Sequence, residues 1–120
     1  NPVDPQIAKD AAGEFYQAMK GGTGIGTDEP AIQSQLKNIK SADEFVAAEA
    51  AYREEYNGRS LIGDFYDEMS TRHIDEFIMP DFERLGLEFP TRDEAENGAG
   101  VIVQNKESIE LNRIKMLAGM

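Results

Sequence analysis

The chain has 120 residues, a formal net charge of -11 and no cysteine, so it has the length of one domain with one hydrophobic core and holds no disulfide or thiol nucleophile. Its 12 basic residues are scattered among 23 acids, which argues against nucleic acid as a partner because phosphate binding needs clustered Lys and Arg. No apolar run approaches the ~20 residues of a membrane-spanning helix, so we expect no transmembrane segment.

Residues 1–19 lack the charged, apolar and small-residue order of a secretion signal. Asn1 stands where an initiator Met is expected, which suggests a processed chain or a piece of a longer one. We therefore expect a soluble protein without a signal peptide in this stretch, and its compartment stays open.

The first predicted helix begins at Asp4-Pro5, where a capping side chain precedes a proline of the first turn. Four apolar residues then recur at i, i+4 spacing: Ile7, Ala11, Phe15 and Met19. Lys20-Gly21-Gly22 marks the end of this helix, and residues 21–26 form a glycine-rich loop.

Four further helices are predicted before Pro80, and the first three of them have their own start signals. The second begins at Thr27-Asp28-Glu29-Pro30 with Thr27 as its N-cap, and the third has Ser41 as N-cap in a capping box with Glu44. Ser60 caps the fourth, and the fifth covers residues 71–79. Short connections favour antiparallel packing, so residues 1–80 are predicted to form an all-α, compact bundle of about five short helices.

Beyond Pro80 the periodicity weakens. Residues 82–85 are expected to form one turn, residues 88–100 a long exposed acidic loop, and residues 101–103 a strand-like stretch without an obvious partner. A final helix is predicted over residues 107–118, with Leu111, Ile114 and either Leu117 or Ala118 on one face. We expect residues 81–120 to pack on the bundle or to extend from it.

The glycine-rich loop is the one segment with candidate chemistry, because glycine allows backbone carbonyls to turn toward one point. Calcium takes roughly six to eight oxygen ligands, so such a loop also needs a carboxylate from elsewhere. By helix order the nearest acids are Asp64, Asp67 and Glu68.

Several motifs along residues 15–79 resemble a single annexin repeat: Met19-Lys20-Gly21, Gly24-Ile25-Gly26-Thr27-Asp28-Glu29, Ala51-Tyr52-Arg53-Glu54-Glu55-Tyr56, Arg59-Ser60-Leu61 and Asp64. The resemblance implies a five-helix bundle that binds calcium in its first interhelical loop and, through the ion, acidic phospholipid membranes. It implies carbonyl ligands at Met19, Gly24 and Gly26 and a capping acid at Glu68. The chain departs from the family in having two extra loop residues, one repeat in place of four, and no counterpart after Pro80.

Two function classes stay open. The first is a non-catalytic, calcium-dependent membrane module. The second is a structural or interaction domain of a larger assembly, such as a phage virion or secreted particle component, which contacts other protein subunits and uses the fold without calcium; here the glycines serve only turns. An enzyme is disfavoured, because the paired acids Glu54 and Glu55 do not face each other on a helix and the single histidine, His73, has no zinc-type spacing.

Overall fold

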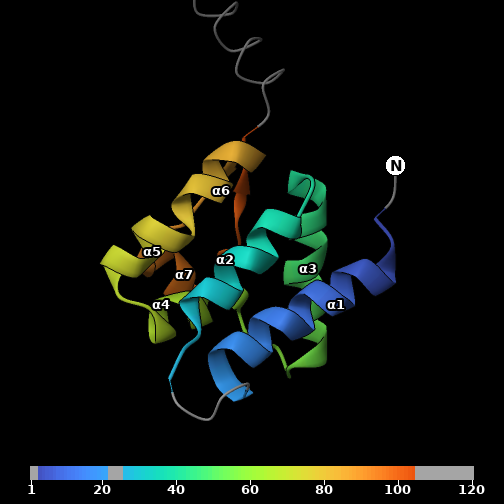
Figure 1. Ribbon diagram of the computed structural model, residues 1–120, viewed down its shortest axis with the longest axis horizontal. Coiled ribbons are helices and arrows are strands. Elements are labelled where there is room, and N and C mark those ends of the chain that lie inside the picture. Colours follow the sequence, from blue (N-terminus) through green and yellow to red (C-terminus); the bar gives the residue numbers. More distant parts are fainter. Residues whose placement is uncertain (1–2, 22–25, 105–120) are drawn as a thin grey trace, which may run out of the picture.

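The computed structural model describes residues 3–21 and 26–104, and these residues confirm the all-α prediction. Seven α-helices, one π-helical turn and a two-stranded sheet make up this part of the chain. Their bounds are α1 Pro5–Tyr16, η1 Gln17–Gly21, α2 Glu29–Asn38, α3 Ala42–Glu55, α4 Leu61–Glu68, α5 Thr71–Phe77, α6 Met79–Leu85, β1 Leu87–Glu88, α7 Arg92–Glu96 and β2 Ile102–Val103. In Figure 1, α1 and α3 lie on one side, α4 and α5 on the other, and α2 between them.

The helix starts follow local capping chemistry. Asp4 caps α1 by accepting from the Gln6 N–H, Ser41 caps α3 by accepting from the Glu44 N–H, and Ser60 caps α4 by accepting from the Gly63 N–H. Each of these side chains satisfies a backbone donor that has no partner inside its helix. The Glu44 carboxylate accepts from Lys40 N–H, one residue before the position expected of a capping box.

A chain of aromatic rings runs through the core. Phe15 of α1 contacts Phe45 of α3 and Phe65 of α4, with ring centroids 6.1 and 5.7 Å apart, and Phe45 contacts Phe82 of α6 at 5.0 Å. All four side chains are fully buried. These rings join helices from both sides of Pro80 into one hydrophobic core, which edge-on aromatic contacts stabilise beyond the area they bury.

The prediction of a long exposed loop over residues 88–100 is wrong. Pro80 lies in the first turn of α6, which begins at Met79. Thr91 caps α7 with a complete capping box in which its hydroxyl accepts from Glu94 N–H and the Glu94 carboxylate accepts from Thr91 N–H. Pro90 and Ala95 are buried, and Tyr66 Oη donates to Pro90 O at 2.5 Å. The predicted helix over residues 107–118 lies outside the described residues.

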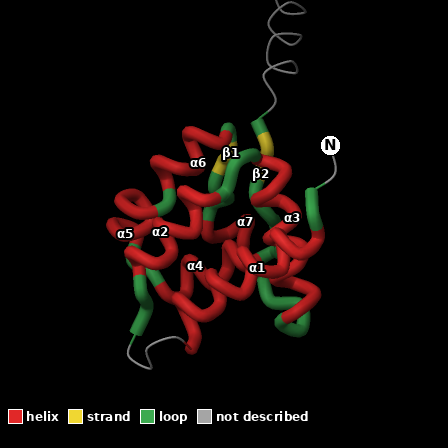
Figure 2. The backbone as a smooth tube through the Cα atoms, turned by 45° about the vertical axis from the view of Figure 1, so that its right-hand side comes forward, coloured by secondary structure: helices red, strands yellow, loops and turns green. Residues whose placement is uncertain are grey.

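The strand-like residues 101–103 have a partner after all. Ile102 and Val103 of β2 pair in antiparallel register with Glu88 and Leu87 of β1, beside α6 (Figure 2). Gly86 ends α6 in the left-handed conformation, with φ at 71°, which lets the chain turn directly into β1.

A buried acid ties α6 to the end of α2. Asp81 is 4% exposed and accepts from Arg84 Nε at 3.0 Å, while Arg84 also donates to the carbonyl oxygens of Leu36 and Ile39. Arg84 thereby adds a second donor to Leu36 O, which already accepts from Ile39 N–H, and a donor to Ile39 O just past the end of α2.

Another buried acid, Glu49 of α3, holds the segment that precedes β2. Its carboxylate accepts from Val101 N–H at 3.0 Å, and a Cβ on Gly100 would lie only 2.8 Å from its Oε1, so a larger residue there would have to displace the Glu49 carboxylate. Burial raises the pKa of Glu49 above its ordinary 4.5, against the opposing effects of Val101 N–H and Arg53.

We expect Glu49→Gln to remove a pH dependence of stability. The native state holds the Glu49 proton more tightly than the unfolded chain, so its contribution to stability is complete below pH 4.5 and is lost as the pH rises through the raised native value. Urea denaturation should therefore show the variant gaining stability relative to wild type from pH 4.5 toward neutral. Glu54→Gln, which alters an exposed acid of the same helix, should show no such trend, and a difference for Glu49→Gln that is constant with pH would contradict the prediction.

Candidate functional site

The candidate calcium loop joins η1 to α2. Its two ends are tied together, because Asp28 N–H donates to Ala18 O at 2.8 Å. Asp28 then starts α2, and its carboxylate accepts from Ala31 N–H at 3.1 Å. The loop thus leaves and re-enters the bundle at one fixed point.

The end of α4 lies directly against this loop. Thr27 Oγ1 donates to the backbone oxygen of Glu68 at 3.3 Å, and Lys20 Nζ lies 3.5 Å from Glu68 Oε1. The side chains of Lys20 and Glu68 are each about three-quarters buried, at 24% and 25% exposed. The structure therefore brings together three residues from η1, the loop and α4, including the acid that the annexin-type pattern selects.

Of the other three predicted ligands, two lie in the described part of the chain and one does not. Met19 lies in η1 with its side chain buried in the core at 4% exposed, so only its backbone oxygen can serve a cation. Gly26 is exposed, and its φ of 65° is one that residues with a Cβ rarely adopt. Gly24 lies outside the described residues.

The assignment of Thr27 as the N-cap of α2 is wrong. Asp28 performs that role, since its carboxylate accepts from Ala31 N–H. Both residue types cap helices well, and the sequence places them side by side. The Thr27 hydroxyl instead donates to the carbonyl of Glu68, a contact across 41 positions that no local pattern contains.

The donor chemistry suits a hard cation. Glu68 offers a carboxylate, and Met19 and Gly26 offer backbone oxygens, which are the ligand types calcium prefers. Within residues 3–21 and 26–104 no group of three or more His, Asp or Glu side chains converges as a metal site, so an ion here depends on carbonyls and water for most of its ligands. His73 faces a single acid, with Nδ1 3.5 Å from Glu29 Oε2.

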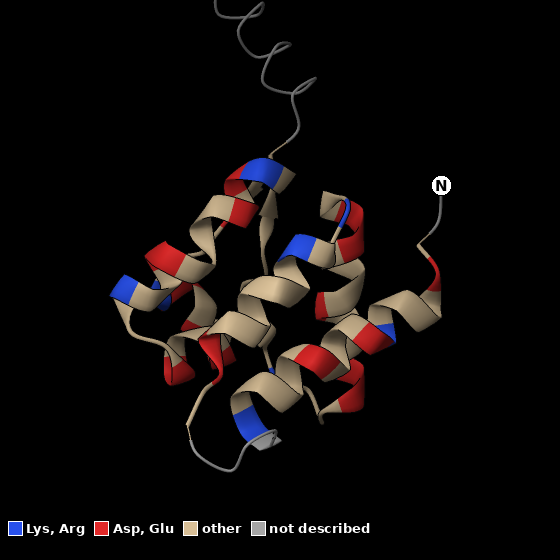
Figure 3. Cartoon of the chain, viewed as in Figure 1, with Lys and Arg blue, Asp and Glu red and all other residues tan. Residues whose placement is uncertain are grey.

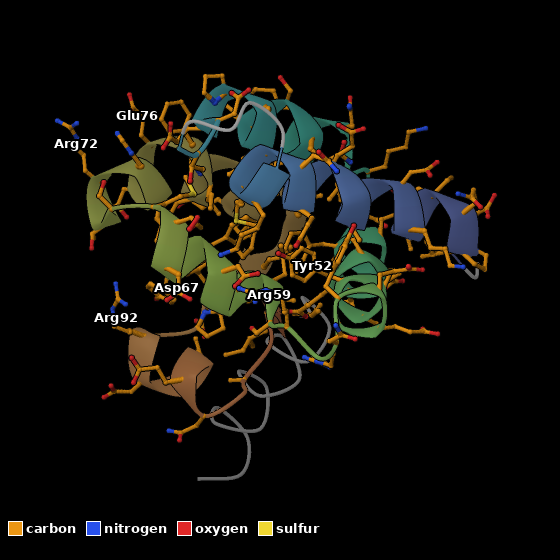
Figure 4. All side chains as sticks on the ribbon, turned by 90° about the horizontal axis from the view of Figure 1, so that it is seen from below. Tyr52, Arg59, Asp67, Arg72, Glu76 and Arg92 are labelled. Carbon is orange, nitrogen blue, oxygen red and sulfur yellow. The ribbon has the colours of Figure 1, made fainter. Side chains whose placement is uncertain are left out.

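A second polar cluster lies where α3 meets α4, and two of its three residues, Tyr52 and Asp64, are buried. Asp64 is 4% exposed and accepts three hydrogen bonds: from Tyr52 Oη at 2.5 Å and from Arg59 Nε and a terminal Arg59 nitrogen at 2.9 Å each. Figure 4 shows Tyr52 and Arg59 beside each other. Burial and the bond to Asp64 raise the pKa of Tyr52, and Asp64 raises the pKa of Arg59. With its oxygens engaged in this way, Asp64 holds the α3–α4 connection.

The sequence pattern suggested Asp64 only as an acid near the loop and did not predict its burial between α3 and α4. A usable signal existed, because Asp64 follows Leu61 by three positions and precedes Phe65, which places it on the apolar face of α4. Because the chain has 23 acidic residues, composition alone does not distinguish Asp64 from the exposed acids.

A pocket of about 180 Å³ separates α4 from α7. The guanidinium carbon of Arg92 lies 4.8 Å from the centre of the Tyr66 ring. Both residues line the pocket together with Asp67 (Figure 4). The lining residues offer a stacked cation and two acids but no paired nucleophile and base.

Acidic residues occur along most of the helices in Figure 3, with basic ones scattered among them. None of the described helices is long and apolar enough to cross a bilayer.

Comparison of the chain with protein-family models, curated proteins and solved structures found no match.

Proposed function

We propose that this chain is a non-catalytic binding module in which the η1–α2 loop and Glu68 hold a calcium ion, and that the ion attaches the protein to acidic phospholipid. The observation that carries the proposal is the position of Glu68, whose backbone oxygen contacts Thr27 and whose carboxylate contacts Lys20. An acid at the end of α4 and a glycine-rich loop between two earlier helices are the arrangement that the resemblance to an annexin repeat implies.

The net charge of -11 explains why an ion is needed for this function. Bare acidic surfaces repel an anionic bilayer, whereas a bound divalent cation reverses the local sign and is shared with lipid phosphate. In this proposal Glu68 supplies the carboxylate, Met19 and Gly26 supply backbone oxygens, and calcium adds the positive charge. The ion must compete with Lys20, which already pairs with Glu68.

Calcium titration by calorimetry tests the proposal directly. We expect saturable binding that Glu68→Gln abolishes and that Asp67→Asn, which changes an exposed acid one position away, preserves. Bound calcium should raise the free energy of unfolding by about 1.4 kcal/mol at ten times the dissociation constant. Pelleting with phosphatidylserine vesicles should require both calcium and Glu68, and pelleting with pure phosphatidylcholine vesicles should fail.

Lys20→Met serves as a further variant. Removing the Lys20 ammonium should strengthen calcium binding, because calcium then no longer has to displace it from Glu68. Absence of calcium binding in wild type and in Lys20→Met alike would contradict the proposed function.

The second candidate is a structural or interaction domain of a larger assembly, for example a virion or secreted particle component, that binds other protein subunits without calcium. The Lys20–Glu68 pair favours it, since the carboxylate already has a cation from its own chain. In that case Lys20→Met and Glu68→Gln should each destabilise the protein slightly and calcium should change neither. Millimolar calcium without effect on the thermal melts supports this candidate.

A further inference from the structure

A groove of about 520 Å³ lies between α6 and the small sheet. Its apolar part comes from Met79, Leu87 and Phe89, and its lining also includes two exposed acids, Glu83 and Glu88. A groove with an apolar part and two acids in its lining matches an apolar segment that carries basic side chains.

Apolar surface continues from the groove onto β2. Ile102 and Val103 remain 39% and 44% exposed, and they are two of the four large hydrophobic residues this exposed in the described part of the chain. Val103 stands directly opposite Leu87 in the antiparallel pair, so both side chains lie on the same face of the sheet. On this face the apolar surface therefore extends from Leu87 to Val103, whereas Ile102 points to the opposite face of the sheet.

The chain continues from the groove. Gln104 lines the groove, and its N–H donates to Gly86 O at 2.8 Å, so the described part of the chain ends at the groove. Sixteen residues follow, from 105 to 120. A helix over residues 107–118 would be roughly 18 Å long, enough to lie across a groove of this size.

The composition of these sixteen residues complements the groove. They carry Lys106, Arg113 and Lys115 against Glu107 and Glu110, a net charge of +1 in a chain whose total is -11. Leu111, Ile114 and Leu117 recur at helical spacing, whereas Ile109 and Met116 fall on the opposite side of such a helix.

We propose that residues 106–118 dock in the groove of their own chain, with Leu111 and Ile114 against the apolar part and Arg113 and Lys115 toward the two acids of the lining. Because the segment starts at the groove, no linker has to be crossed, and its effective concentration there is on the order of millimolar or higher. The docked segment covers the apolar surface that β1, β2 and α6 leave open.

Hydrogen exchange on the full chain tests this. We expect amides of residues 109–118 and 87–89 to exchange on the order of tenfold more slowly in wild type than in a Leu111→Ser, Ile114→Ser variant. The matched control, Ile109→Ser with Met116→Ser, makes the same chemical change on the opposite side and should keep the protection. Wild-type amides of residues 109–118 exchanging at unstructured-peptide rates would overturn the proposal.

Charge reversal gives an independent readout. Glu83→Lys with Glu88→Lys changes two exposed side chains and should release the segment, and adding Arg113→Glu with Lys115→Glu should restore protection. Sedimentation shows whether the segment docks in its own chain or in a second copy. Protection that is independent of protein concentration, in a chain that sediments as a monomer, supports docking within one chain. Protection that appears only with dimer formation assigns the groove to a second copy and overturns the proposal.

Discussion

Asp64→Ala should lower the free energy of unfolding by about 2–4 kcal/mol, measured by urea denaturation. The substitution leaves the hydroxyl of the fully buried Tyr52 without its partner and removes the carboxylate that pairs with Arg59. Arg59 has a 43% exposed side chain and can turn toward water, so the loss should stay below that of a pair buried on both sides.

Asp67→Ala provides the matched control, since Asp67 lies on the same helix and is exposed. It should change the unfolding free energy by less than about 0.5 kcal/mol. Equal effects of the two substitutions would show that the Tyr52–Asp64–Arg59 cluster contributes nothing specific to stability.

Phe82→Ala should cost about 3–5 kcal/mol, the usual range for removing a fully buried aromatic ring. The Phe82 ring contacts Phe45 at 5.0 Å and Phe89 at 5.2 Å, so its loss opens a cavity between α3, α6 and the segment after β1. Thermal denaturation should remain a single transition at a lower temperature, because residues on both sides of Pro80 share one core.

Phe77→Ala is the corresponding control. Phe77 is only partly buried against the core, and its substitution should cost clearly less than that of Phe82. Two separate transitions in wild type or in Phe82→Ala would mean that residues after Pro80 unfold independently of the bundle.

The sequence predicted the first five helices because their signals are local. Apolar residues recur at helical spacing, and Asp4, Ser41 and Ser60 stand where helices begin. The elements after Pro80 are too short for periodicity: α7 has five residues and each strand has two. Their conformation depends on tertiary contacts such as the buried Pro90 and the bond from Tyr66 to its carbonyl.

The candidate site was predicted in part. Proximity of Glu68 to the loop followed from counting along a known pattern, and the structure places its backbone oxygen against Thr27. The ion pair with Lys20 was not anticipated, because it depends on how η1 faces the end of α4. Burial of Asp64 was missed because sequence composition describes an average acid, whereas its three hydrogen bonds come from Tyr52 of α3 and Arg59 of the α3–α4 connection.

The bond from Asp28 N–H to Ala18 O has a consequence for loop length. It fastens the entry of the loop to its exit, so the pairing of the first two helices is independent of how many residues run between them. Doubling such a loop costs only about 0.6 kcal/mol in closure entropy. The segment between Lys20 and Gly26 is therefore a position where a peptide epitope or an added ligand-bearing sequence can be inserted while the bundle keeps its register.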